Sequence, residues 1–316
     1  MSPRRIVLDC DPGHDDAVAI VLAAGIDEIE LAAITTVAGN QSLARTSDNA
    51  LRVCALAGIE VPVGAGCDRP LVRPLEVAAD IHGESGLDGA VLPEPTMALD
   101  PRHGVDLLID TVFAGSGHTT VVATGPLTNV AAALRRAPAI VEKIDEIVLM
   151  GGAEGRGNVT PTAEFNIYVD PEAAAIVFES GLPVTMIGLD LTHQALATPE
   201  VRARLRAQGS TLALTIDDLL GFFAETYRDV FGFASPPVHD ACAVAYVARS
   251  ALVRTAERFV AVECHGTWTR GTTVIDTHER LGRPPNARVA TVLDAEGFWN
   301  LVLGATARLG IGESTL

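Results

Sequence analysis

The sequence predicts an α/β fold: one domain over residues 1–316 with a mostly parallel, open, Rossmann-like sheet, helices on its faces and further helices in the C-terminal half. The main observation is that short β-rich apolar runs alternate with helical stretches over residues 5–190. This alternation is typical of βαβ units and a parallel sheet. No linker-like change of composition divides the chain, which favours one domain although the length alone allows two.

The first half of this pattern begins with an apolar run of strand length at 5–11. The dipeptide Pro12–Gly13 provides a turn, and a helix is expected at 15–25 with Asp15 or Asp16 as its cap. A second strand at 31–38 is rich in β-branched residues. A helix at 42–58 and a short strand at 61–64 follow, and then an irregular Gly- and Pro-containing stretch at 66–101 interrupts the alternation.

The alternation then resumes. It predicts helices at 105–114, 127–137 and 171–181 and strands at 119–125, 146–152 and 183–190. Further along, the 3.6-residue apolar periodicity predicts a long helix at 210–230, a second helix is expected at 239–249, and strand-like segments lie at 258–263 and 287–294. In open parallel sheets ligands bind beyond the carboxyl ends of the strands, so polar residues that follow strands are the first functional candidates.

Charge and composition exclude several classes of partner. The chain has 40 acidic and 23 basic residues, a net charge of −17, with Lys143 its only lysine. Because no basic stripe is present, neither nucleic acid nor an anionic membrane surface is an expected partner. No apolar run approaches the ~20 residues that span a bilayer, and the early acidic residues leave no room for a signal peptide. Five cysteines without a CxxC pair favour reduced thiols, and hence a cytoplasmic location.

The highest local density of ionisable residues is at 7–17, VLDCDPGHDDA. Four aspartates, Asp9, Asp11, Asp15 and Asp16, lie there around the end of the first predicted strand. Carboxylates packed this closely repel one another unless a cation intervenes. Oxygen ligands without histidine or cysteine partners favour Ca²⁺ or Mg²⁺ over zinc. The alternative is that one aspartate caps the helix while the others face solvent, which is less common for four aspartates in one turn.

Three Asp-rich or phosphate-binding motifs fit poorly. An EF-hand starting at Asp9 needs glycine and glutamate where this chain has His14 and Ile20. A phosphatase of the haloacid-dehalogenase type would have a hydroxyl or small apolar residue in place of Gly13, and a partner lysine that is hard to find here. A Gly-rich loop ending in Lys-Ser/Thr is absent from the sequence. Many carboxylates with little positive charge suit a neutral polyol, such as a sugar, better than a phosphate ester.

At residues 9–17 the sequence DCDPGHDDA resembles the signature of the inosine–uridine-preferring nucleoside hydrolases. Other blocks resemble that family in the same order along residues 5–246, and the combination is specific. These blocks are VAGN at 37–40, HGESGLDG at 82–89, ATGPLTN at 123–129, MGGA at 150–153, EFNIYVDPEA at 164–173 and PVHDACAVAY at 237–246.

The resemblance implies a Ca²⁺-dependent enzyme that hydrolyses the N-ribosidic bond of purine and/or pyrimidine ribonucleosides. Side-chain oxygens of Asp11, Asp16 and Asp240 and the main-chain carbonyl of Thr124 would bind the ion, and Asp9 would brace their loop from behind. The ribose hydroxyls would complete the ion's ligand set. The implied substrate-binding residues around the ribose are Asp15, Asn40, Met150, Asn158, Glu164 and Asn166.

The same residues suit the chemistry of ribosyl cleavage. Positive charge develops on the sugar in the transition state and nearby carboxylates stabilise it. Asp11 would take the proton of the attacking water.

Four residues are candidates for contacts with the leaving base. His239 is the expected general acid, with a pKa near neutrality, or else a helix-start histidine beside a metal ligand. Phe223 and Tyr227 would flank the base or pack in the core, and His82 would approach the base or lie solvated in its loop. His193 and Cys10 are interpreted as structural. Both tryptophans lie outside the matched blocks, which favours the base-tolerant members of the family over those that stack the base on Trp.

Two other functions stay open. One is a calcium-stabilised nucleoside- or sugar-binding protein that does not turn over, and the other is a metal-dependent phosphatase. Ribose release from nucleosides, with and without EDTA, separates them from the hydrolase. For the assembly we expect a homotetramer or a homodimer.

Overall fold

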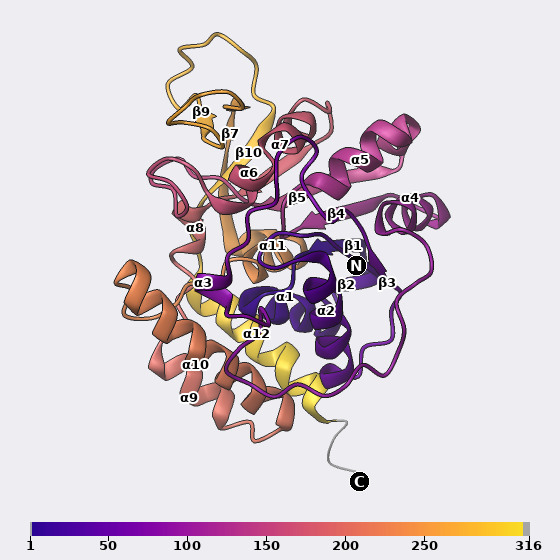
Figure 1. Ribbon diagram of the computed structural model, residues 1–316, viewed down its shortest axis with the longest axis vertical. Helices are drawn as coiled ribbons and strands as arrows, with labels where there is room; N and C mark the ends of the chain where they lie inside the picture. The colour runs from indigo at the N-terminus through magenta and orange to yellow at the C-terminus, as the bar shows by residue number, and fades with distance from the viewer. Residues whose placement is uncertain (1, 312–316) are drawn as a thin grey trace.

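The computed structural model describes residues 2–311, and an eight-stranded sheet forms their centre. The strand order is β3-β2-β1-β4-β5-β6-β10-β7, and every neighbouring pair is parallel except β10 and β7 (Figure 1). The predicted mostly parallel, open sheet flanked by helices is therefore confirmed. The strands are β1 (Arg4–Cys10), β2 (Ile29–Thr36), β3 (Val63–Ala65), β4 (Thr119–Ala123), β5 (Ile144–Met150), β6 (Val184–Ile187), β7 (Val253–Arg258) and β10 (Ala287–Leu293).

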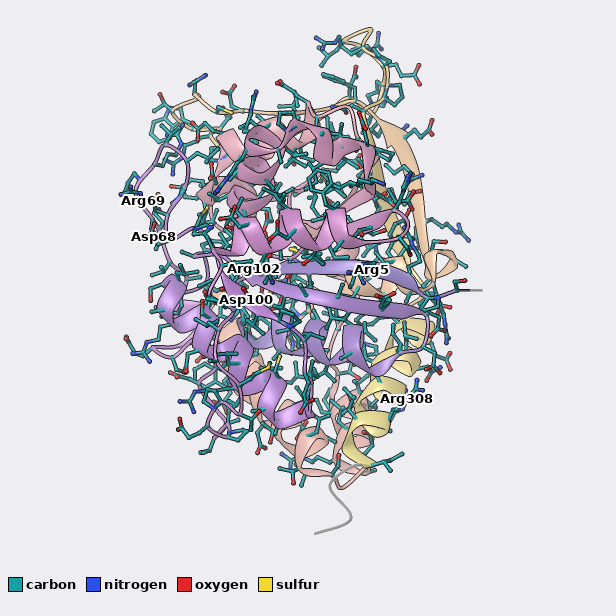
Figure 2. All side chains as sticks on the ribbon, turned by 90° about the vertical axis from the view of Figure 1, so that its right-hand side faces the viewer. Arg5, Asp68, Arg69, Asp100, Arg102 and Arg308 are labelled. Atoms are coloured by element: carbon teal, nitrogen blue, oxygen red, sulfur yellow. The ribbon has the colours of Figure 1, made fainter. Side chains whose placement is uncertain are left out.

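Helices cover both faces of the sheet, which separates two hydrophobic clusters (Figure 1 and Figure 2). Side chains alternate along β1, so Ile6 and Leu8 join one cluster and Val7 joins the other. The Ile6 side is covered by α1 (His14–Gly25), α2 (Leu43–Ala57), α11 (Ala241–Ala248) and α12 (Ala295–Gly310), and the Val7 side by α4 (Gly104–Ala114), α5 (Thr128–Arg136) and α7 (Pro171–Phe178). This burial on both faces explains why the central strands are continuous apolar runs.

The strand order reverses direction at β1. The chain runs from β1 outward to β2 and β3, and then returns to place β4 on the other side of β1. Ligands of open α/β sheets bind at such a switch point, beyond the carboxyl ends of the strands. Asp11 directly follows β1 and Thr124 directly follows β4, so the topology alone brings these two distant residues together.

Further helices extend the C-terminal half, as expected. The long helix α10 (Thr211–Phe231) packs against α9 (Pro199–Arg206), α12 and the short helix α3 (Ala79–His82), which lies inside the stretch predicted to be irregular. Other short segments are α6 (Phe165–Val169), α8 (Leu189–Thr192), η1 (Pro138–Glu142) and η2 (Ser250–Leu252). No helix among the described residues combines the length and the apolar character needed to cross a membrane.

Three sequence-based boundaries were wrong. The strand expected at 183–190 stops at Ile187, because the N–H of Leu189 bonds to the carbonyl of Gly152 and α8 begins there. The segment expected as one strand at 258–263 divides: β7 ends at Arg258 and pairs with β10, while β8 (Val260–Val262) pairs with β9 (Thr273–Ile275) in a separate two-stranded sheet.

The third boundary is the start of α1. The helix begins at His14 with Gly13 as its N-cap, so neither Asp15 nor Asp16 occupies the capping position. Asp16 nevertheless supports the helix start, because its Oδ2 accepts a hydrogen bond from the N–H of Gly13 at 3.0 Å. This hydrogen bond from the N-cap residue to the side chain of the third helical residue satisfies one of the free N–H groups at the helix start.

Candidate active site

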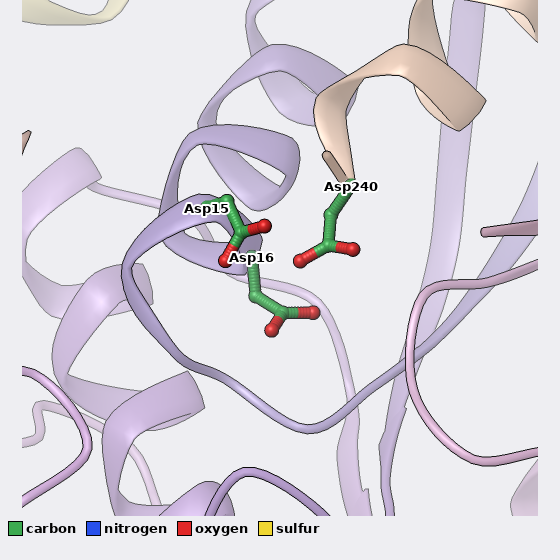
Figure 3. Close-up of side chains that lie close together, drawn as sticks. All are labelled: Asp15, Asp16 and Asp240. Atoms are coloured by element: carbon green, nitrogen blue, oxygen red, sulfur yellow. The ribbon is translucent and has the colours of Figure 1, made fainter. Parts of the chain in front are cut away.

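Three carboxylates converge at the switch point. Asp15 and Asp16 lie in the first turn of α1, and Asp240 is the N-cap of α11 (Figure 3). One oxygen of each lies within 4.8 Å of the others, and all three side chains are buried. The helix starts that carry them add positive N-terminal dipoles, which favour negative charge at this place.

Asp11 lies beside this group with one oxygen unsatisfied. Its Oδ2 accepts from the backbone N–H of Asn40 at 2.6 Å, whereas its Oδ1 is buried without a hydrogen-bond partner among the described residues. Two glycines make room for this carboxylate. A Cβ on Gly125 would lie 2.6 Å from Oδ1, and one on Gly39 would overlap Oδ2. A buried, unpaired carboxylate oxygen is costly, so it indicates a ligand that is bound during function.

The side chain of Asn40 connects the two parts of the cluster. Its Nδ2 donates to the main-chain carbonyl of Asp11 at 3.1 Å and to Oδ2 of Asp16 at 3.3 Å. Thr124 approaches from β4, where its hydroxyl donates to Oδ1 of Asp16 at 2.8 Å. The carbonyl of Thr124 accepts from Nδ2 of Asn166 at 2.8 Å, which brings the predicted carbonyl ligand and a predicted ribose contact to the same point.

Asp9 lies behind this group and holds the strands in register. Its Oδ1 accepts from the Thr35 hydroxyl at 2.6 Å and from Nδ2 of Asn129 at 2.8 Å. Its main-chain carbonyl accepts from the N–H of Thr124 at 2.7 Å. Sequence reasoning did not single out Thr35 or Asn129, although Asn129 closes the ATGPLTN block.

Burial and mutual repulsion make this cluster electrostatically unfavourable without a cation. Desolvation raises the pKa of Asp9 and of Asp15 to about 7 and that of Asp16 to about 6, and the neighbouring carboxylates add to the rise at Asp15. The pKa values of Asp11 and Asp240 are raised well above their ordinary range for the same two reasons. A hard divalent cation would remove the repulsion and supply the missing partner of Asp11, so the residues fit such an ion.

A cavity of about 280 Å³ adjoins the cluster. Asp9, Asp11 and Asp16 are not among the residues that line it. Their place behind the cavity wall suits the predicted roles of Asp9 as a brace and of Asp11 and Asp16 as ion ligands. All the other predicted site residues line it: Asp15, Asn40, His82, Thr124, Met150, Asn158, Glu164, Asn166, Phe223, Tyr227, His239 and Asp240.

One end of the cavity is polar. Glu164 caps α6, where its Oε1 accepts from the N–H of Asn166 at 2.8 Å and its Oε2 from the N–H of Gly152 at 2.9 Å. Burial raises the pKa of Glu164 to about 7. Asn158 accepts from the N–H of Phe165 at 2.9 Å, and the carbonyl of Met150 accepts from Nδ2 of Asn166 at 3.1 Å. These fixed polar groups suit the hydroxyls of a sugar.

The other end is aromatic and contains His239. Its Nε2 lies 2.7 Å from the Tyr227 hydroxyl, and its Nδ1 lies 2.7 Å from the Thr192 hydroxyl. Burial lowers the pKa of His239 to about 3. The expectation of a pKa near neutrality is therefore not met, since burial removes water from around this ring and the neighbouring His193 lowers the pKa further.

Several residues at the aromatic end of the cavity were not predicted from the sequence. Phe231 lines the cavity, and it follows Phe223 and Tyr227 at the same four-residue spacing on α10, a signal that was available. His14 stacks on Phe222, Phe223 and His82 with ring centroids 5.2 to 5.4 Å apart. His82 is buried, so the solvated-loop interpretation was wrong. Other unpredicted lining residues are Val77, Ala78, Asp80, Ile81, Val159, Phe165 and Val230.

The family model described as inosine-uridine preferring nucleoside hydrolase matches residues 6–300. The chain belongs to this family. The nucleoside hydrolase is 47% identical over 302 residues to the pyrimidine-specific ribonucleoside hydrolase RihB of Escherichia coli strain K12, with 96% of each chain covered. Because the match is nearly full-length, the protein is a ribonucleoside hydrolase that cleaves N-glycosyl bonds.

Solved structures agree with this assignment. The nucleoside hydrolase is similar to a purine-preferring ribonucleoside hydrolase from Gardnerella vaginalis, with a TM-score of 0.91, 35% identity and coverage of 97% of this chain and 99% of the other. It is also similar to a plant nucleoside hydrolase, with a TM-score of 0.89, 31% identity and coverage of 98% and 99%. Nucleoside hydrolases depend on a metal ion, and the acidic cluster of this chain has carboxylates close enough together to hold one.

Proposed function

We propose that this enzyme is a calcium-dependent ribonucleoside N-glycosidase that releases ribose and a free base from purine and pyrimidine ribonucleosides. The observation that carries the proposal is the unpaired, buried Oδ1 of Asp11 beside three converging carboxylates, at the polar end of a cavity. A set of hard oxygen donors without histidine or cysteine suits Ca²⁺, which accepts many oxygen ligands in a flexible geometry.

Asp11, Asp16, Asp240 and the carbonyl of Thr124 would hold the ion. The ion, when bound, would bind the ribose hydroxyls and lower the pKa of a water molecule. The positions of these residues support this assignment: Asp11 and Asp16 lie behind the cavity wall, while Thr124 and Asp240 line it. Asp15, also at the wall, is then free to accept a hydrogen bond from the sugar.

The chain's own residues would perform the remaining steps. Asp11 takes a proton from the attacking water. Asp15, Asn166 and Glu164 hold the ribose hydroxyls at the polar end of the cavity, and the negative charge of Asp15 and Glu164 stabilises the positive charge that develops on the sugar ring. Asn40, Asn158 and Met150 complete this end, where they keep the loops around the sugar in place.

Departure of the base requires a proton, and we assign its delivery to His239 acting with Tyr227. His239 is neutral and carries one N–H, so it cannot donate to both of its partners. If the Thr192 hydroxyl donates to Nδ1, then Nε2–H faces the Tyr227 oxygen and frees the phenol hydrogen for the base. The pair would therefore donate through Tyr227: the phenol hydrogen passes to the base, Nε2–H of His239 stabilises the phenolate that remains, and solvent returns a proton to Tyr227. Phe223 and His82 flank the base.

The Tyr227 hydroxyl, at the aromatic end of the cavity, supports the acceptance of both purine and pyrimidine bases. A hydroxyl on the side of the cavity can donate to a ring nitrogen or a carbonyl oxygen, and both purines and pyrimidines offer these acceptors. RihB is named pyrimidine-specific and the Gardnerella vaginalis enzyme purine-preferring, so neither preference follows from membership of the family.

The deciding experiment is ribose release from uridine, cytidine, inosine and adenosine before and after EDTA treatment, followed by readdition of Ca²⁺ or Mg²⁺. We expect hydrolysis that EDTA abolishes and Ca²⁺ restores. Nucleoside binding without ribose release would instead identify a binding protein, and release of phosphate from a phosphomonoester would identify a phosphatase. Full activity in EDTA would contradict the assignment of the ion.

We further propose a homodimer or homotetramer in the cytoplasm. Trp268 and Val72 are 87% and 71% exposed, and we take these two apolar side chains as candidates for the interface. All five cysteines carry free thiols, which fits a reducing compartment. Light scattering coupled to size-exclusion chromatography measures the assembly, and a monomeric mass would contradict it.

A further inference from the structure

The separate two-stranded sheet of β8 and β9 (Figure 1) is joined to the loop that follows β5 by two consecutive threonines. The hydroxyl of Thr273, the first residue of β9, accepts a hydrogen bond from the N–H of Ala153 at 2.9 Å. It donates one to the carbonyl of the same residue at 2.8 Å. The hydroxyl of Thr272 donates to that of Thr162 at 2.8 Å. Because Ala153 and Thr162 lie near opposite ends of the loop 151–163, the two hydroxyls hold it at both ends.

Gly152 allows Thr273 to lie this close to the loop. Its φ of +76° belongs to the left-handed region that favours glycine. A Cβ at this position would lie 2.8 Å from Cγ2 of Thr273 and 2.9 Å from its Oγ1. Thr273 and Ala153 are both buried, and a buried N–H and a buried carbonyl each need a hydrogen-bond partner. The single hydroxyl of Thr273 serves as a partner for both groups.

The peptide plane between Gly152 and Ala153 is therefore fixed through both of its polar groups. Its N–H donates to Thr273, and its carbonyl, that of Gly152, accepts from the N–H of Leu189 at 2.9 Å. The N–H of Gly152 itself donates to Oε2 of Glu164 at 2.9 Å. Thr273 is thus connected to the Glu164 carboxylate, which lines the cavity, through one glycine.

The same loop carries Asn158, which also lines the cavity. Its side-chain oxygen accepts from the N–H of Phe165 at 2.9 Å, and its own N–H donates to the carbonyl of Ala163 at 3.1 Å. Asn158 is thereby tied to the end of the loop that Thr162 and Thr272 hold. A shift of either anchored end would change where the polar side chains of this part of the cavity lie.

We propose that Thr273 and Thr272 are positioning residues for the ribose end of the cavity: they hold the two ends of the loop 151–163 and so set the positions of Glu164 and Asn158. The proposal rests on the proposed function in one respect, that Glu164 and Asn158 lie at the ribose. Neither threonine lines the cavity, so each acts only through the loop. The sheet of β8 and β9 contributes no residue to the cavity lining and supports substrate binding from outside it.

The test compares variants that remove a hydroxyl and keep the shape of the side chain. Thr273→Val removes both hydrogen bonds to Ala153, whereas Thr273→Ser keeps the hydroxyl and loses only a methyl group. Thr306→Val is the matched control, because Thr306 is also buried but its hydroxyl donates to the carbonyl of Val302 within its own helix, α12. Calcium affinity should stay at the wild-type value in all three, since none of these side chains belongs to the acidic cluster.

Hydrogen exchange measured by mass spectrometry gives a readout independent of activity. In Thr273→Val, the amides of a peptide that covers residues 151–163 should exchange about tenfold faster than in the wild type, as expected for two lost hydrogen bonds of ordinary strength. Thr273→Ser and Thr306→Val should leave the exchange of this peptide unchanged. Wild-type exchange in Thr273→Val, or equally fast exchange in Thr306→Val, would overturn the inference.

Kinetics show whether the loop acts on the sugar. Thr273→Val should lower kcat/KM for uridine about tenfold, by the same factor for every base that the enzyme accepts, and Thr273→Ser should stay within about twofold of the wild type. The loss should shrink for at least one of 2′-, 3′- and 5′-deoxyuridine, namely the one that lacks the hydroxyl beside Glu164 or Asn158. An equal loss on uridine and all three deoxyuridines would overturn the inference.

Thr272 is tested through its partner. Thr272→Val and Thr162→Val should each lower kcat/KM about threefold, and the double variant should be no worse than either single one, because both remove the same contact. Losses that multiply would overturn the role of Thr272. Absence of ribose release by the wild-type enzyme with calcium would contradict the proposed function instead, and hydrogen exchange would still decide whether the threonines hold the loop.

Discussion

The hydroxyl oxygen of Tyr227 lies 2.7 Å from Nε2 of His239, and this contact joins α10 to the residue that precedes Asp240. One histidine therefore links the aromatic end of the cavity to the acidic end. Its other nitrogen contacts Thr192 at the same distance, so the ring is fixed on both sides. Substitutions at the two ends of the cavity should have different effects, because the aromatic end would protonate the base and the acidic end would bind the ion and the ribose.

His239→Ala should reduce kcat on natural ribonucleosides about 10²- to 10⁴-fold, the usual contribution of a positioned general acid. Tyr227→Phe should also reduce it, since it removes only the phenol oxygen of the same pair. Both losses should nearly vanish for p-nitrophenyl riboside, whose leaving group departs without a proton. Equal losses on the two substrates would show that these residues support the fold or the ion site instead.

Asp11→Ala and Asp240→Ala should each abolish tight calcium binding and activity. Each removes an anionic oxygen and part of the geometry of one hard-cation site. Isothermal titration with Ca²⁺ and a ribose-release assay measure the two effects. An ion that binds only the folded state stabilises it, so the gain in Tm on adding Ca²⁺ should also disappear. Stoichiometric calcium with near-normal turnover in either variant would refute the assigned ligands.

Gly39→Ala should weaken calcium binding even though glycine supplies no ligand, because the new Cβ would overlap Oδ2 of Asp11 and displace that carboxylate. Gly304→Ala is the matched control. Gly304 is exposed in α12 and a Cβ there meets nothing within 4 Å, so this change should raise the free energy of unfolding by about 1 kcal/mol. Urea unfolding and calcium titration of both variants provide the comparison, and unchanged calcium affinity in Gly39→Ala would be the contrary result.

Ribonucleosides should be strongly preferred over 2′-deoxyribonucleosides, and nucleoside monophosphates should react slowly. A missing 2′-hydroxyl leaves buried polar groups of the site without a partner. A 5′-phosphate would meet the negative charge of Asp15 and Glu164, with no lysine or arginine among the residues that line the cavity. Comparison of kcat/KM for uridine, deoxyuridine and uridine monophosphate tests both statements, and similar values would contradict them.

Stabilisation by calcium should increase with pH. Burial raises the pKa of Asp9 and of Asp15 from 3.8 to about 7, so between these values the metal-free folded state binds more protons than the unfolded state. Its stability therefore falls as the pH rises through this window. Calcium requires the ionised carboxylates, so the difference in Tm between calcium and EDTA samples should be wider near pH 8 than near pH 5. Parallel Tm curves would contradict this coupling.

The sequence by itself determined the sheet and much of the site. Its apolar runs are continuous because the strands are buried on both faces, and four aspartates around one βα turn are too costly without a cation. These are local signals, readable at the residues that carry them. The local signals did not connect Asp16 with Asp240. The resemblance to the nucleoside hydrolases did, and the structure brings these two carboxylates together with that of Asp15.

Only the tertiary structure decided the properties that depend on distant neighbours. The low pKa of His239 arises because packing excludes water from the ring and places His193 nearby, which no local sequence pattern records. Likewise, the contact of His14 with His82 joins residues 68 positions apart, and the capping of α1 depends on where the turn at Gly13 ends. Charge and hydrophobicity are encoded residue by residue, whereas desolvation and hydrogen-bond partnership exist only once the chain has folded.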